Sequence, residues 1–198
     1  MTLHRFLAAC APGAAAVCAS AAIAAPIAYV TNEGSGTVSV VDTATDKVTA
    51  TLKLGQKPRG IALSTDGSRL YLSDQTANAL VVVDTAKRTE IGRVNLGESP
   101  EAIYLSPDGK WIAAAVEEND QVVIVDTALL KVARTVKMRG KNPEHAVWSP
   151  DGKWLYVSAE EADSVDIIDV GKGEVVKSVK VGDRPRSIGF LPDGSRAY

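Results

Sequence analysis

The sequence predicts an all-β fold, a β-propeller built from four-stranded antiparallel blades. A hairpin-like segment recurs four times, the recurrence has a period of 42 or 43 residues, and each period holds four short apolar runs typical of strands. A period of roughly 40–45 residues with several strands in each copy is characteristic of propeller blades. A solenoid of helices is excluded, because the runs are rich in Val and Thr and alternate with a period of two.

The recurring segment starts at a proline, crosses an Asp-Gly turn and ends in a second apolar run. Its copies start at Pro58, Pro100, Pro143 and Pro185. In the copy P-E-H-A-V-W-S-P-D-G-K-W-L-Y-V-S, proline suits the φ-restricted position of the turn and glycine suits the position with positive φ. Each copy therefore predicts the two inner strands of a blade, here called runs A and B.

Two further runs complete each period. Run C, for example L-V-V-V-D, is almost continuously apolar, which is expected of a strand covered on both faces by neighbouring blades. Run D alternates and carries the lysines of an exposed outer edge, Lys53, Lys137 and Lys180. Run C ends at periodic aspartates that are expected to form Asx turns rather than a site, because each occupies the same place in a different blade: Asp42, Asp84, Asp126 and Asp169.

The propeller repeats are predicted over residues 25–198, in units 29–70, 71–112, 113–155 and 156–197. The chain enters in run B of one blade, completes three full blades and reaches run A of another at Pro185–Leu191. Closure into a four-bladed ring is disfavoured, because Ala197 and Tyr198 would compete with Ala28 and Tyr29 for one place. We expect an incomplete arc with exposed faces, the N-terminal part of a longer ring of about seven blades.

Residues 1–24 are predicted to be a cleavable signal peptide. An Ala-rich stretch follows Arg5 and ends in the A-x-A site Ala22–Ala24. The alternatives are an uncleaved anchor, for which the stretch is short and interrupted by Pro12 and Gly13, and a lipoprotein box ending at Cys10, for which the apolar region would be only Phe6 to Ala9. Both cysteines, Cys10 and Cys18, lie in this segment, so the exported chain would have no disulfide. The expected location is the periplasm.

The composition describes an ordinary globular chain. It is 45% hydrophobic and 23% charged, with a formal net charge of -2. No basic footprint for nucleic acid is present, so nucleic acid is not an expected partner. Beyond the signal segment, no apolar stretch approaches the ~18 residues of a membrane span.

The candidate binding site lies where each run D connects to the next run A. The residue after the proline is charged in every copy, namely Arg59, Glu101, Glu144 and Arg186, and His145 follows Glu144. Innermost strands gather around a propeller axis, so these side chains are predicted to line the channel mouth. They would orient an ionic ligand or a partner loop. The alternative is a hydrated lining of weak ion pairs.

No catalytic residue, metal or cofactor is predicted. One histidine with Glu101 and Glu144 could ligate zinc or iron, but no compact ligand motif supports such a site. The chain has no C-x-x-C-H haem motif and no G-x-S-x-G elbow. The three tryptophans are expected to pack between blades: Trp111, Trp148 and Trp154.

The segment Tyr29-Val30-Thr31-Asn32, followed by G-S-G-T-V-S-V-V-D-T-A-T-D-K-V, resembles the bacterial propeller repeat named after its Y-V-T-N start. The resemblance extends to Tyr198. With a signal peptide directly before it, the chain is similar to the exported propellers associated with pyrroloquinoline quinone-dependent alcohol catabolism. This resemblance implies a periplasmic propeller and, as partner, a quinoprotein dehydrogenase. It implies no single conserved reaction.

The function expected from these observations is that of an exported, non-catalytic binding or accessory module. Two alternatives remain open at this point. One is a propeller enzyme or redox domain, lactonase-like or similar to the cytochrome d1 haem domain. The other is a surface or adhesive propeller.

Overall fold

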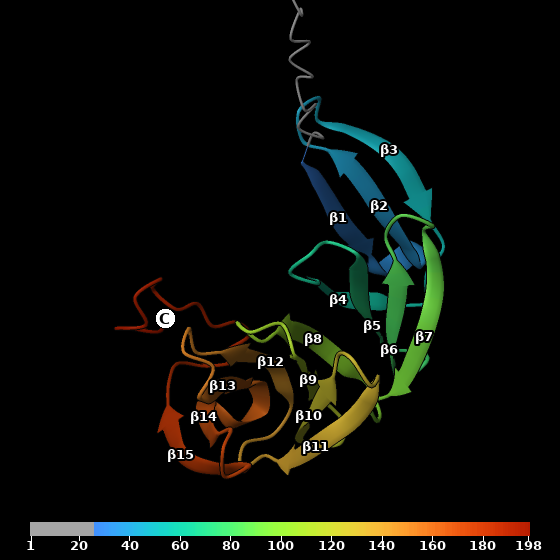
Figure 1. Ribbon diagram of the computed structural model, residues 1–198. Coiled ribbons are helices and arrows are strands. Elements are labelled where there is room, and N and C mark those ends of the chain that lie inside the picture. Colours follow the sequence, from blue (N-terminus) through green and yellow to red (C-terminus); the bar gives the residue numbers. More distant parts are fainter. Residues whose placement is uncertain (1–25) are drawn as a thin grey trace, which may run out of the picture.

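The computed structural model describes residues 26–198, which form four twisted antiparallel sheets arranged along an arc (Figure 1). We call the sheets blades 1 to 4. Blade 1 has three strands: β1 (Ile27–Asn32), β2 (Thr37–Asp42) and β3 (Lys47–Leu52). Blade 2 has four: β4 (Pro58–Leu63), β5 (Arg69–Asp74), β6 (Ala79–Asp84) and β7 (Thr89–Asn95).

Blades 3 and 4 repeat the four-stranded pattern. Blade 3 contains β8 (Pro100–Leu105), β9 (Trp111–Val116), β10 (Gln121–Asp126) and β11 (Lys131–Lys137). Blade 4 contains β12 (Pro143–Trp148), β13 (Trp154–Ala159), β14 (Ser164–Asp169) and β15 (Glu174–Lys180). Short 3-10 turns at Glu33–Ser35 and Glu160–Ala162 follow β1 and β13. The predicted all-β propeller fold is confirmed.

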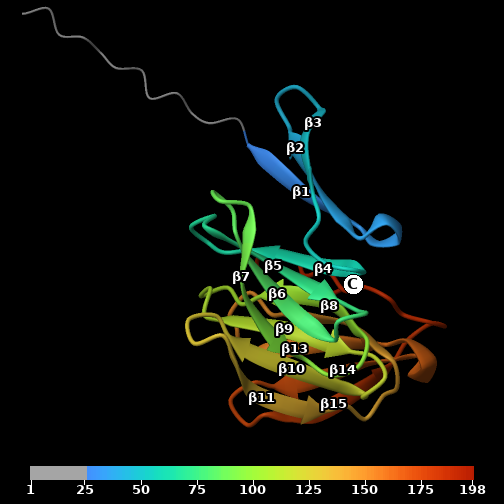
Figure 2. The ribbon, with the colours of Figure 1, turned by 90° about the vertical axis from the view of Figure 1, so that its right-hand side faces the viewer.

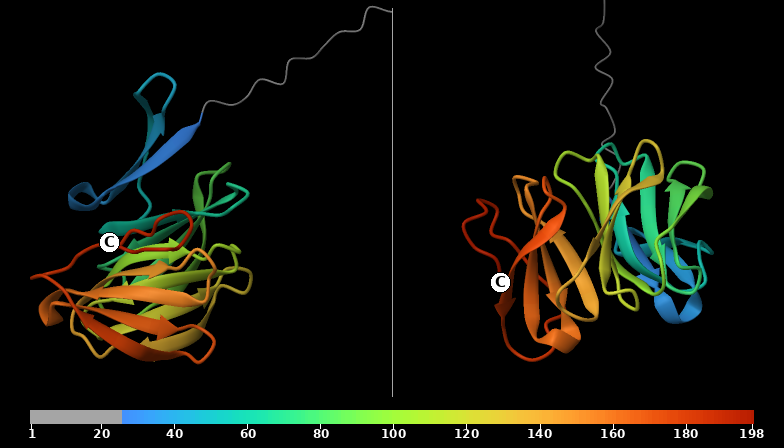
Figure 3. Two further views of the ribbon diagram at one scale, coloured as in Figure 1. Left: turned by 90° about the vertical axis from the view of Figure 1, so that its left-hand side faces the viewer. Right: turned by 90° about the horizontal axis from the view of Figure 1, so that it is seen from below.

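Strands pair in chain order within every blade, so each blade is a meander. The innermost strands β4, β8 and β12 begin at the periodic prolines and contact one another along the arc. The outer edge of each blade is the run D strand, as predicted. Figure 2 shows the blades stacked, and Figure 3, from below, shows the sheets face against face. Because successive inner strands lie side by side, residues at the same register form a row along the inner side of the arc.

The core lies between the blades rather than inside any one of them. The central strand β6 is buried on both faces: Leu80 and Val82 pack in the cluster between blades 2 and 3, while Val81 and Val83 pack in the cluster between blades 1 and 2. All four residues are at most 1% exposed. Burial on both faces is the physical reason for the continuous apolar run seen in the sequence.

The turns also follow the predicted chemistry. Lys87 N donates to Asp84 Oδ1 at 2.8 Å and Ala44 N donates to Asp42 Oδ1 at 2.8 Å, so the periodic aspartates close Asx turns. Gly67 and Gly152 adopt a φ of 71° in the Asp-Gly turns. The periodic aspartates and the glycines of the Asp-Gly pairs therefore form the turns between strands.

The C-terminal segment departs from expectation. The sequence predicts a run A strand over Ser187–Leu191, in the copy that starts at Pro185, but the structure has only an isolated bridge there, between Phe190 and Ala197. A strand needs a neighbour to accept its backbone hydrogen bonds, and the described residues supply only the first residues of the run B that would pair with this segment, at Arg196–Tyr198. The predicted signal peptide lies outside the described residues. Within residues 26–198 no helix is long and apolar enough to cross a membrane.

Candidate functional site

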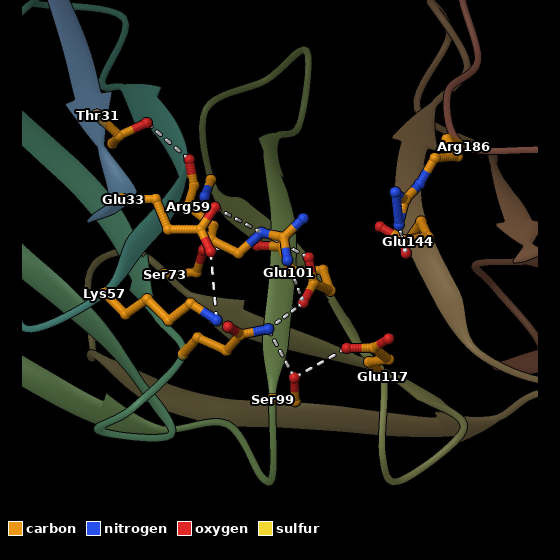
Figure 4. Close-up of polar contacts among 12 residues, drawn as sticks. Thr31, Glu33, Lys57, Arg59, Ser73, Ser99, Glu101, Glu117, Glu144 and Arg186 are labelled. Carbon is orange, nitrogen blue, oxygen red and sulfur yellow. Dashed lines mark hydrogen bonds and ion pairs between the residues drawn. The ribbon is translucent and has the colours of Figure 1, made fainter.

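The charged residues of the predicted ring lie on the inner side of the arc (Figure 4). Arg59, Glu101 and Glu144 are the second residues of β4, β8 and β12, and Arg186 occupies the same register after blade 4. Figure 4 shows them as two groups, Arg59 with Glu101 and Glu144 with Arg186. The four charged residues of the predicted ring thus form two ion pairs along the arc. Arg59 of blade 2 pairs with Glu101 of blade 3, and Glu144 of blade 4 pairs with Arg186 of the segment that follows it.

The first pair joins blades 2 and 3 in a fork-like geometry. Arg59 Nη1 donates to Glu101 Oε1 at 3.1 Å, and Arg59 Nε lies 2.8 Å from Glu101 Oε2. The Glu101 side chain is 1% exposed, whereas that of Arg59 is 30% exposed. A carboxylate this deeply buried needs its partner, because removal of one member of a buried pair leaves an uncompensated charge.

The second pair extends to a third charged side chain. Arg186 Nη2 donates to Glu144 Oε1 at 2.7 Å and to Glu160 Oε2 at 2.8 Å. Arg184 also donates to Glu160. Both glutamates are buried, while the Arg186 side chain is 55% exposed. One guanidinium group therefore holds two buried carboxyl groups together.

A second row of polar residues stands directly behind the ring, and the sequence prediction missed it. These residues follow the run B strands with the spacing 42, 42 and 43: Glu33, Gln75, Glu117 and Glu160. Gln75 Nε2 donates to Glu101 Oε1, and Glu33 lies 3.2 Å from Lys57. Comparing every polar column of the repeat, rather than only the residue after the proline, would have found this row.

Burial governs the ionisation of the two inner glutamates. It raises the pKa of Glu101 to about 7, although the charge of Arg59 opposes this change. Burial and a hydrogen bond with Glu160 raise the pKa of Glu144 to about 7. The same hydrogen bond lowers the pKa of Glu160. Glu144 and Glu160 thus behave as a carboxyl–carboxylate pair that retains a proton near neutral pH.

His145 pairs with a residue that the sequence prediction did not include. Its Nδ1 lies 2.7 Å from Tyr104 Oη, and the two ring centroids are 5.8 Å apart. Burial, together with the charges of Arg59 and Arg186, lowers the pKa of His145, so the imidazole is neutral near pH 7. The carboxyl groups of Glu101 and Glu144 form ion pairs with Arg59 and Arg186 and not with His145. His145 is therefore a hydrogen-bonding group of the mouth.

A cleft of about 390 Å³ opens between these elements. Its polar lining comes from four strands and one turn: Thr31, Glu33, Arg59, Glu101, Tyr104 and His145. Within residues 26–198 no group of three or more His, Cys, Asp or Glu is arranged to hold a metal ion. The chemistry that the described lining offers is hydrogen bonding and charge pairing.

Comparison with protein families identifies the repeat. A family model for YNCE-like β-propellers matches residues 68–192. The chain belongs to this family. No curated protein matches the chain. The YNCE-like assignment agrees with the propeller repeat predicted from the Y-V-T-N resemblance.

Solved structures confirm the propeller architecture of this YNCE-like chain. Hydrazine synthase of Kuenenia stuttgartiensis superposes with a TM-score of 0.80 at 28% identity, over 85% of this chain and 50% of that one. A candidate 6-phosphogluconolactonase from Bacteroides uniformis superposes with a TM-score of 0.75 at 18% identity, over 89% of this chain and 61% of that one. The chain thus spans about half to three fifths of the length of these proteins.

Proposed function

We propose that this YNCE-like propeller is an exported binding module that holds an acidic loop of a protein partner at its inner mouth. The supporting observation is the asymmetry of the two ion pairs, in which the carboxyl groups are buried and the guanidinium groups of Arg59 and Arg186 remain accessible. Arginine has five N–H donors, and Arg59 places only two nitrogens on Glu101. The remaining donors suit carboxylates of a partner.

The periplasm is the proposed location, and a quinoprotein dehydrogenase that oxidises alcohols is the proposed partner. Residues 1–24 and the resemblance to exported propellers of alcohol catabolism support this part of the proposal. A non-catalytic role is supported by the state of the polar groups. Glu101 and Glu144 are bound to arginines, and Nδ1 of the neutral His145 is engaged by Tyr104.

The test compares capture of the dehydrogenase from periplasmic extract of alcohol-grown cells by the wild-type protein and by an Arg59→Gln, Arg186→Gln double variant. We expect recovery to fall about tenfold or more, because a loss of 1.4 kcal/mol already gives that factor. Arg93→Gln is the matched control, since Arg93 forms an exposed ion pair with Glu90 on the outer strand β7. Its recovery should equal that of the wild type.

Each part of the proposal has its own contrary result. Equal capture by the double variant would remove the inner mouth as the binding site. Capture that never includes a dehydrogenase would remove the partner. Turnover of a lactone panel that is abolished by His145→Ala, or a Soret band in the purified protein, would overturn the non-catalytic role.

A further inference from the structure

A slot opens between blades 3 and 4, at the strand ends that lie opposite the inner mouth. Its lining consists of two indole rings, aliphatic side chains and one guanidinium group: Trp111, Ile124, Ala133, Arg134, Trp148 and Val170. Trp148 is the last residue of β12, whereas Glu144 of the mouth is the second. The slot has a volume of about 260 Å³ and lies between two four-stranded blades, so it is separate from the charged mouth.

The equivalent place between blades 2 and 3 is filled by two side chains. Arg69, the first residue of β5, crosses the interface, and its Nη1 donates to Thr127 O at 2.8 Å. Leu130, which follows β10, packs against the apolar cluster between these blades. Its Cδ1 lies 2.8 Å from the position that a Cβ atom of Gly92 would occupy. A leucine of blade 3 therefore fits over a glycine of blade 2.

Three residues differ at the interface between blades 3 and 4. One period later, the positions of Arg69, Gly92 and Leu130 hold Trp111, Arg134 and Gly173. The glycine now belongs to the later blade, and a Cβ atom at Gly173 would lie 2.8 Å from Arg134 Cδ. Arg134 Nη1 donates to Val170 O at 2.5 Å, the acceptor equivalent to the one that Arg69 uses. Since Gly173 has no side chain to replace that of Leu130, the interface retains an open slot beside the two tryptophans.

The slot combines apolar surface with an accessible cation. Trp111 and Trp148 pack in the apolar cluster between the blades, and indole rings offer the flat surfaces against which another aromatic ring packs. Arg134 is exposed, and a guanidinium group has five N–H donors, of which Val170 O takes one. The described lining contains no carboxyl group. An apolar cavity of ~150 Å³ already holds benzene, so the slot has room for one ring and an anionic group.

We propose that this slot binds a small aromatic carboxylate, whose ring packs against Trp111 and Trp148 and whose carboxylate group binds Arg134. The charges are complementary, and a planar guanidinium group accommodates both oxygens of a carboxylate. The ligand is a small one, because the slot is smaller than the roughly 300–1,000 Å³ of pockets for drug-sized molecules. This site is independent of the partner proposed for the inner mouth, since it lies at the other ends of the strands.

The first test measures the binding of benzoate and of benzamide to the full exported chain by titration with saturation-transfer NMR. Benzamide has the same ring without the charge. We expect benzoate to bind with a dissociation constant on the order of 1 mM. Benzamide should bind at least about tenfold more weakly, because it lacks the charge-assisted hydrogen bonds with Arg134. Absence of benzoate binding, or equal affinity for the two probes, would overturn the proposal.

The variant Arg134→Gln separates the role of the charge from that of the slot. It should bind benzoate at least about tenfold more weakly than the wild type. Its affinity for benzamide should stay within about twofold, since both indole rings remain. Arg93→Gln is the matched control, because Arg93 is also an exposed arginine of an outer strand, β7, and it should bind both probes as the wild type does. An equal loss of benzoate binding in the two variants would mean that net charge attracts the carboxylate, which contradicts the proposal.

A double variant, Arg134→Gly with Gly173→Leu, copies the Gly92–Leu130 pair and should close the slot. Leucine suits this turn position, since Leu130 adopts a φ of 51° there and Gly173 a φ of 74°. We expect neither probe to bind to the double variant, whereas Arg134→Gln still binds benzamide. Trp154→Ala, a change at an exposed tryptophan outside the slot lining, should leave the binding of both probes unchanged. Benzamide binding to the double variant at wild-type affinity would place the site elsewhere and overturn the proposal.

Discussion

At the scale of single residues, Glu101 and Glu144 are the unusual side chains of this propeller. Each is a carboxyl group buried at an inner strand, held by an arginine, with a pKa raised to about 7. The sequence predicted that both would line the mouth, because both follow a periodic proline. It did not predict their burial, which depends on how far the neighbouring blade covers each side chain.

We predict that stability falls as pH rises from 5 to 8. A raised folded-state pKa means that the folded protein holds the proton more tightly, so this stabilisation is complete below the ordinary value of 4.5 and is lost as pH passes about 7. The expected loss of unfolding free energy is on the order of 1 kcal/mol, measured by urea titration at each pH. The lowered pKa of Glu160 acts in the opposite direction below this window, and the lowered pKa of His145 offsets part of the loss below its ordinary value of 6.5.

The variants Glu101→Gln and Glu144→Gln should flatten this dependence, since glutamine accepts hydrogen bonds without titrating. Glu90→Gln serves as the control, because Glu90 is an exposed residue of the outer strand β7 with a lowered pKa. If the unfolding free energy changed with pH by the same slope in Glu90→Gln as in Glu101→Gln and Glu144→Gln, the inner carboxyl groups would not be the titrating groups.

At the scale of strands, Gly60 determines how closely β4 approaches β8. Its equivalents in the other copies, Ala102, His145 and Ser187, carry side chains. A Cβ atom at Gly60 would lie 2.6 Å from Ile103 N and 2.8 Å from Glu101 O. Both contacts are with the backbone, which cannot rotate away. The absence of a side chain therefore lets two inner strands touch beside the Arg59–Glu101 pair.

Gly60→Ala is expected to reduce the free energy of unfolding by about 1–3 kcal/mol, the usual cost of overpacking. The measurement is urea denaturation followed by circular dichroism. Gly34→Ala is the comparison, because a Cβ there meets nothing within 4 Å. Its effect should stay below about 1 kcal/mol. If Gly60→Ala lowered the free energy of unfolding no more than Gly34→Ala does, β4 and β8 would be able to move apart at little cost.

The strands themselves were predictable, and the exposure of their side chains was less so. The alternation of run D and the continuous apolar run C identified outer and central strands. The prediction that the tryptophans pack between blades holds for Trp148, which is buried between blades 3 and 4, but Trp154 is exposed. Trp111, its equivalent in blade 3, is partly buried against the cluster toward blade 4, whereas no following blade among the described residues covers Trp154.

At the scale of the whole molecule, stability is a sum of blade-to-blade contacts, as in other repeat proteins. Blade 3 is covered on both faces by separate apolar clusters. Trp148 is the largest side chain of the cluster toward blade 4, and its Nε1 donates to Tyr104 O across the interface at 3.0 Å. This residue couples the last blade to the rest.

Trp148→Ala is expected to cost about 3–5 kcal/mol, with the loss concentrated at one interface. Hydrogen exchange followed by mass spectrometry should then accelerate in β13 and β14 of blade 4, while β5 and β6 of blade 2 keep their protection. Trp154→Ala, at the exposed tryptophan, should change neither. Equal acceleration in all blades would show that the molecule opens as one unit and not blade by blade.

The sequence by itself determined the blade architecture, the order of strands within a blade, the turn chemistry and the register of the charged positions. All of these are local or periodic, so one copy of the repeat predicts the next. The tertiary structure decided the partner of each polar side chain at the mouth. Arg59 pairs with Glu101 of the next blade, and Arg186 bridges Glu144 and Glu160. The hydroxyl group of Tyr104 forms a hydrogen bond with Nδ1 of His145. Such contacts depend on the spacing between blades and on how much of each side chain a neighbouring blade covers. The sequence pattern of the repeat determines neither quantity.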